Sequence, residues 1–175
     1  MAASVKDAHA TYSVNIDCGL LPKDVAEGDT INPDGIHPYD KKPVGIRAAH
    51  VTMRDLYGAK GVWGGPVLQS AQVAGGGVIL TFANAGKGLV LVGRFGFEIA
   101  GADGVLYNAS VKIVSENKIR VSSDKVAKPV KVVYGMHNAD LDEIESYAEC
   151  VCLYNTKGED KSVAYPAEQF TWTKE

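Results

Sequence analysis

The 175-residue sequence has no long hydrophobic run, and none approaches the roughly 18 residues that a membrane-spanning helix needs. It also has no cluster of positive charge, because its 18 basic residues are scattered and Lys41-Lys42 is the only adjacent basic pair. A nucleic acid would require a concentrated basic face. The sequence therefore predicts neither a membrane nor a nucleic-acid partner. The early charges Lys6 and Asp7 leave no room for a secretory signal, so we expect a soluble chain of unknown compartment.

Cysteine is scarce, with only Cys18, Cys150 and Cys152 in the chain. On a strand, Cys150 and Cys152 would place their Cα atoms about 6.6 Å apart, near the upper limit for a disulfide. We therefore expect no disulfide and small buried thiols. The histidines are dispersed, and no His or Cys spacing resembles a set of zinc ligands, so the sequence predicts no metal and no cofactor.

The most informative segment is Asp34-Gly35-Ile36-His37-Pro38, which places a carboxylate and an imidazole three positions apart at the start of a probable helix. These are two of the three groups of a Ser-His-Asp triad. Pro38 pushes His37 toward extended geometry, which would present the imidazole at the helix entrance. We predict that His37 is a catalytic base and that Asp34 orients it. A surface-loop histidine without a catalytic role is the alternative for the pentapeptide by itself.

The third group of the triad is missing. Of the nine serines, only Ser4 and Ser13 precede Asp34, and neither stands in a glycine-bracketed turn of the kind that presents a nucleophile. The other seven follow the pair. The nucleophile is therefore expected on a different stretch of polypeptide.

Residues 1–58 show the order of a parallel α/β sheet, with a strand, a loop that carries the catalytic groups and then a helix. The alternating run Tyr12–Asp17 predicts the strand. Pro43 suits the first turn of the helix and Gly58 its end. One strand and one helix cannot form a stable domain, so we interpret this region as the remnant of a larger α/β domain. The helix face expected to be buried consists of Ile46, Ala49, Met53 and Leu56.

Residues 59–175 carry many short, alternating runs separated by glycine-containing turns, a pattern typical of an antiparallel β-sandwich. The clearest period of two lies in Val105–Val114. We therefore predict a mainly β fold, with domains at 1–58 and 59–175. The predicted strands are Val67–Val73, Val78–Ala83, Leu89–Val92, Phe95–Ile99, Val105–Val114, Lys118–Ser122, Val130–Tyr134, Glu149–Tyr154 and Gln169–Thr173.

The run from Asp34 to Arg47 resembles the last motif of SGNH hydrolases, in the form found in sialate O-acetylesterases and related carbohydrate acetylesterases. Further landmarks similar to the C-terminal part of that family follow in order: Gly65-Pro66-Val67, Phe97–Gly104, Val121-Ser122-Ser123, Pro129–Tyr134 and Leu153-Tyr154-Asn155. The resemblance implies that His37 is the catalytic base and Asp34 its partner, while the serine and the oxyanion-hole groups belong to earlier blocks. It implies that residues 1–58 are the end of a flavodoxin-like α/β/α domain and that the rest is a β-rich domain beside it. It also implies that the chain is the C-terminal portion of an acetylesterase, whose partners are a serine-bearing portion and an acetylated carbohydrate. Members of the family that the chain resembles are often secreted or lysosomal.

Two other interpretations stay open. The β-domain could act alone as a carbohydrate-binding or interaction module, because sugar rings stack on aromatic faces. The candidates are Trp63, Tyr107, Tyr134, Tyr154, Tyr165 and Trp172. Alternatively, the chain is an inactive truncated product whose exposed sheet edge and helix face favour self-association.

Overall fold

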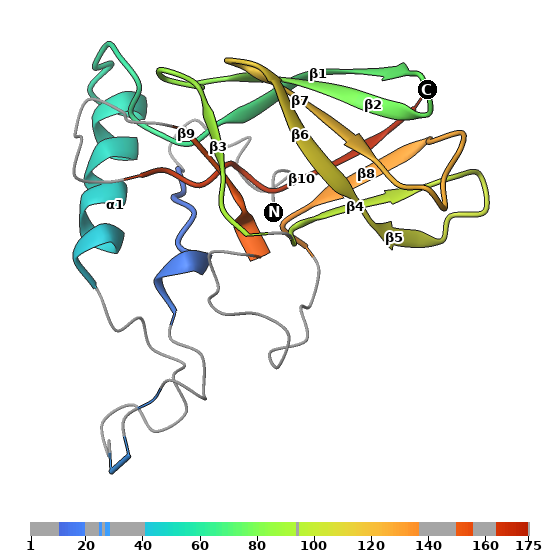
Figure 1. The fold of residues 1–175 in the computed structure, drawn as a ribbon. Coiled ribbons are helices and arrows are strands. Elements are labelled where there is room, and N and C mark those ends of the chain that lie inside the picture. The colour runs from blue at the N-terminus through green and yellow to red at the C-terminus, as the bar shows by residue number, and fades with distance from the viewer. Residues whose placement is uncertain are drawn as a thin grey trace.

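The computed structural model describes residues 11–19, 25, 27–28, 41–93, 95–136, 150–155 and 164–174. These residues form ten strands and one α-helix (Figure 1), so the prediction of a mainly β fold with antiparallel sheets is confirmed. In this part of the chain no helix is long and apolar enough to cross a bilayer.

The strands form two four-stranded antiparallel sheets and one two-stranded sheet. The first sheet has the order β1 (Val67–Ala74), β2 (Gly77–Ala83), β7 (Lys118–Ser122) and β6 (Ser110–Ser115). The second has the order β10 (Phe170–Thr173), β8 (Lys131–Tyr134), β4 (Phe97–Ala100) and β5 (Leu106–Asn108). The two-stranded sheet pairs β3 (Leu89–Leu91) with β9 (Leu153–Asn155).

The hydrophobic core is built by alternate residues of the central strands. Val78, Leu80 and Phe82 of β2 are buried, because a strand places every second side chain on the same face. Residues of β7, β4 and β8 meet them from both sheets, and each large apolar side chain so buried contributes roughly 1.5–3 kcal/mol. An aromatic cluster closes the core, consisting of Phe82, Phe97, Tyr134 and Phe170.

The run Val105–Val114 was predicted as one strand, and the structure divides it into β5 and β6. The two pieces belong to different sheets, with a bend at the buried Ala109, whose N–H donates to the Phe97 carbonyl oxygen at 3.0 Å. Strands that pass from one sheet to the other are a usual way of making a sandwich corner. Both pieces are edge strands, and Ile113 of β6 and Val105, just before β5, are exposed.

The predicted strand Tyr12–Asp17 is wrong. Its last part is a 3-10 turn, Ile16–Cys18, and residues 11–15 have no regular secondary structure. A strand requires a neighbour for its backbone hydrogen bonds. Here the Val14 carbonyl oxygen accepts instead from the side chain of Arg47.

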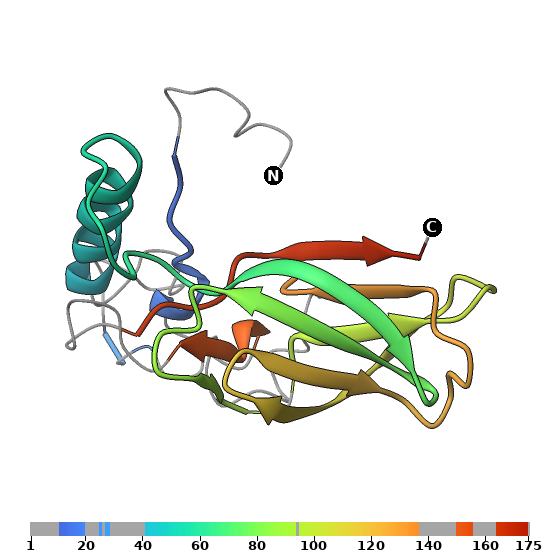
Figure 2. The same ribbon diagram turned by 90° about the horizontal axis from the view of Figure 1, so that it is seen from above.

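Helix α1 (Lys41–Asp55) lies beside one end of the sandwich (Figure 2). Pro43 is in its first turn as predicted, and Gly58, with φ +64°, turns the chain away shortly after its last residue. The predicted buried face is wrong, because Met53 and Leu56 are 41% and 60% exposed. The helix instead buries Arg47 and Val51, and Arg47 donates hydrogen bonds to Asp17 and to the Ala164 carbonyl oxygen on the segments that flank the helix.

Candidate functional site

The predicted catalytic pair, Asp34 and His37, lies outside the described residues. The description resumes at Lys41, the first residue of α1, four positions after His37. The roles of Asp34 and His37 therefore stay predictions, as does the division of the chain into 1–58 and 59–175. The structure does show how α1, the element that directly follows the pair, is held in place.

Arg47 is the centre of this attachment and is only 5% exposed. Its Nη1 and Nη2 atoms donate to the two carboxylate oxygens of Asp17 at 2.6 and 2.8 Å, a bidentate ion pair. It also donates to the carbonyl oxygens of Val14, at 3.1 Å, and Ala164, at 2.8 Å. Burial alone would lower the pKa of Arg47, but the hydrogen bonds and charge of Asp17 outweigh it and raise that pKa. One side chain thus connects α1 with the N-terminal and C-terminal segments.

Further contacts join the same three segments. The Tyr12 hydroxyl donates to the Glu168 carboxylate at 2.7 Å, and burial together with this carboxylate raises the pKa of Tyr12. His50 of α1 contacts the Tyr165 hydroxyl through Nδ1, and its ring lies 4.8 Å from that of Trp63. We call this region, in which residues 11–18 and 164–168 hold α1, the α1 junction.

The interior of the α1 junction is closely packed. The cavity among Tyr12, Arg47, Arg54, Tyr165 and their neighbours has a volume of about 20 Å³, enough for about one water molecule. No sugar ring fits such a space. Among the described residues, no group of three or more His, Cys, Asp or Glu side chains lies together as a metal site requires. The junction therefore fixes the position of a helix and offers no substrate pocket.

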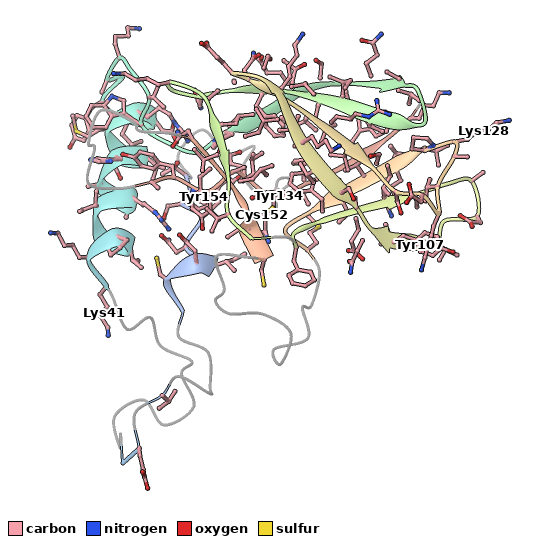
Figure 3. The ribbon with its side chains drawn as sticks, in the orientation of Figure 1. Lys41, Tyr107, Lys128, Tyr134, Cys152 and Tyr154 are labelled. Atoms are coloured by element: carbon pink, nitrogen blue, oxygen red, sulfur yellow. The ribbon has the colours of Figure 1, made fainter. Side chains whose placement is uncertain are left out.

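The structure also limits which aromatic residues can bind sugars. Tyr134, Tyr154 and Tyr165 are buried, so the prediction that they are available for stacking is wrong. Figure 3 shows Tyr134 and Tyr154 inside the molecule close to Cys152. The Tyr134 hydroxyl donates to the Leu153 carbonyl oxygen at 3.4 Å. Burial in the same region raises the pKa of the Cys152 thiol to about 12. Trp63, Tyr107 and Trp172 are half-buried and keep part of their rings accessible.

The motif landmarks in the β-region are mainly core and bracing positions. Asn155 is 2% exposed, and its Nδ2 atom donates to the carbonyl oxygens of Gly64 and Asn84 at 2.8 and 3.1 Å. Phe97, Val121 and Tyr134 are likewise buried. These positions therefore serve packing, and Asn155 joins β9 to the loop before β1.

The pair of Arg47 and Asp17 was not predicted. The sequence pattern places Arg47 away from the predicted buried face of the helix, and it places Asp17 at the end of the predicted strand Tyr12–Asp17. The two residues are 30 positions apart, and no spacing rule connects them. The only available signal was an arginine within a helix whose apolar stripe is short.

No protein-family model matches the chain. No curated protein matches it significantly. Among solved structures, it is similar to the crystal structure of a protein described as a novel carbohydrate acetylesterase from Xanthomonas citri, with 30% sequence identity and a TM-score of 0.65. This similarity covers 91% of the present chain and 31% of the other protein.

The chain has a fold related to part of that acetylesterase. It spans about a third of the length of the solved protein.

Proposed function

We propose that the chain is the C-terminal portion of a carbohydrate O-acetylesterase of the SGNH type, similar to sialate O-acetylesterases, and that it supplies Asp34 and His37 to a serine carried by another portion. The similarity to a carbohydrate acetylesterase over 91% of the chain is the observation that carries this proposal. The sequence motif from Asp34 to Arg47 supports it independently.

In the assembled enzyme, the serine hydroxyl attacks the carbonyl carbon of an acetyl group on a sugar, and His37 accepts the hydroxyl proton. Asp34 holds the imidazole in the required tautomer and stabilises the imidazolium. His37 then gives the proton to the departing sugar oxygen, which leaves an acetyl-serine. Water, activated by His37, attacks this ester, so that acetate is released and the serine is restored. His37 must be placed accurately for this chemistry, and the α1 junction holds the helix that follows it.

The outer face of α1 supports the presence of a partner portion. Met53, Leu56 and Tyr57 are 41%, 60% and 75% exposed, and Ala49 beside them is also exposed. We call these four residues the outer face of α1, although Leu56 and Tyr57 directly follow its last helical residue, Asp55. An amphipathic helix normally turns its apolar side to the protein interior. Because the polar side of α1 already contacts the flanking segments at the α1 junction, the outer face is available to pack against the serine-bearing portion.

The test is acetate release from an acetylated sugar by this chain mixed with a separately produced serine-bearing portion, identified from the DNA upstream of the gene. We expect the mixture to be active and each part alone to be inactive. Complex formation without any gain in acetate release over the separate parts would refute the proposal.

A further inference from the structure

A groove lies at the end of the sandwich away from α1. Two loops form it, residues 101–105 between β4 and β5 and residues 123–130 between β7 and β8. Its volume is about 380 Å³, within the range of small-ligand sites. In Figure 3, Lys128 and Tyr107 mark this end, and Lys41 of α1 lies at the opposite end.

The two loops are held by their own hydrogen bonds and by contact with each other. The Val105 N–H donates to Asp103 Oδ1 at 3.2 Å, and the Val126 N–H donates to the Ser123 carbonyl oxygen at 3.0 Å. Val126 is buried in the core and anchors its loop. The two loops are also linked at their bases, where the Val130 N–H donates to the carbonyl oxygen of Ala100, the last residue of β4, at 2.9 Å. Contacts within the protein therefore shape the groove.

Two of the three charged side chains that line the groove are positive, on a chain whose net charge is −3. Lys125 and Lys128 line it against the single carboxylate of Asp103, which gives two positive charges against one negative. The nearby Asp124 is exposed but does not line the groove. Both lysines are exposed, so their ammonium groups can pair with an anion without leaving water.

Other groups of the groove suit a sugar ring better than a bare anion. Ala102 and Ala127 line it with methyl groups, which can contact the apolar face of a pyranose. Lys125 Nζ lies 5.2 Å from the ring centroid of Tyr107, a cation–π contact that holds this lysine at the groove. The Asp103 carboxylate can accept hydrogen bonds from sugar hydroxyls.

We propose that this groove binds an acidic saccharide, with the carboxylate of a uronic or similar sugar acid on Lys125 and Lys128 and its ring against Ala102 and Ala127. The assignment of a saccharide rests on the proposed esterase function. The groove is remote from α1, so it would hold a second part of a polymeric substrate away from the bond that is cleaved.

The test is titration of the isotope-labelled chain with a galacturonate oligosaccharide, followed by NMR and by calorimetry. Shifts should concentrate at residues 101–103 and 125–128, and binding should weaken as salt is added. The double variant Lys125→Gln/Lys128→Gln should lose about tenfold in affinity, because each exposed ion pair contributes roughly a factor of three. The matched variant Lys60→Gln/Lys87→Gln, with two exposed lysines elsewhere, should bind as the original does.

Three outcomes would overturn the inference. The galacturonate oligosaccharide could produce no shifts, or both double variants could lose affinity equally. Polyaspartate could also bind as well as the saccharide with the same dependence on Lys125 and Lys128, which would show a site for carboxylates in general. A neutral xylan oligosaccharide of equal length should bind more weakly. This experiment needs only the present chain, so its result is independent of acetate release by the assembled enzyme.

Discussion

At the scale of single residues, the structure depends on a few polar side chains buried at the α1 junction. Arg47 and Asp17 form a bidentate ion pair, and Arg47 also donates to two backbone carbonyl groups. Removing one partner of a buried ion pair leaves an uncompensated charge, which is usually costlier than the pair itself is stabilising.

Arg47→Met should therefore lower the free energy of unfolding by about 3 kcal/mol, because it leaves the Asp17 carboxylate buried without a counter-charge. Urea denaturation of the chain measures this change. The control is Arg120→Met, since Arg120 is half-buried and also donates to backbone carbonyls, those of Ala74 and Gly75. That variant should lose about 1 kcal/mol. Equal losses in the two variants would show that the ion pair has no special role.

A second prediction concerns Cys152, whose buried thiol has a pKa raised from 9.0 to about 12. Above pH 9 the thiol ionises in the unfolded chain but stays protonated in the folded one, so unfolding releases a proton. The stability contributed by the neutral thiol is complete below about pH 9 and is lost as the pH rises toward 12, on the order of 1 kcal/mol by about pH 10. Burial also raises the pKa values of Tyr134 and Tyr154, which act in the same direction.

The measurement is the free energy of unfolding as a function of pH from neutral to alkaline conditions, for the original chain and for Cys152→Ala. The variant is less stable overall because of the lost side chain, so the slopes are compared and not the absolute values. We expect a shallower alkaline slope in the variant. Identical slopes would mean that the Cys152 thiol does not titrate on unfolding.

At the scale of elements, the sequence predicted where most strands lie. Alternation of apolar residues and the glycine-containing turns fixed the positions of β1, β2 and β7 closely. Local patterns could not show which sheet each strand joins, since sheet order depends on contacts between distant residues. The switch of sheets at Ala109 is such a case.

Helix α1 illustrates the same limit. Its start and end followed from local chemistry at Pro43 and Gly58. Its buried face did not, because the apolar stripe predicts where a helix packs only when all of its neighbours are present. The polar side reached Asp17 and Ala164, and the outer face remained exposed.

Substitutions on this outer face should separate folding from assembly. Leu56→Asp should change the stability of the chain by no more than about 0.5 kcal/mol, because Leu56 is 60% exposed. The same change should weaken association with the serine-bearing portion by about tenfold or more, as expected for an apolar contact at an interface.

Calorimetric titration of the two portions provides the measurement. Ile113→Asp on β6 is the matched control, because Ile113 is also apolar and 44% exposed but is remote from α1. It should leave the affinity unchanged. Loss of affinity in the β6 variant alone would place the interface on the sandwich edge.

At the scale of the whole molecule, the described residues combine a sandwich core with one α-helix held at its end. Composition and alternation were sufficient to predict the mainly β class. The catalytic hypothesis came from a motif of five residues and its resemblance to a family. Because the proposed triad is divided between polypeptide portions, neither the composition nor the fold of this chain can reveal the complete site.

The most direct test of the central claim is the initial rate of acetate release by the chain assembled with its serine-bearing portion, compared with that of the His37→Ala assembly. Loss of a triad member should reduce turnover by a factor on the order of 10⁶. His9→Ala should retain the original rate, and both variants should associate normally with the partner portion. An assembly with His37→Ala that releases acetate at the original rate would contradict the account.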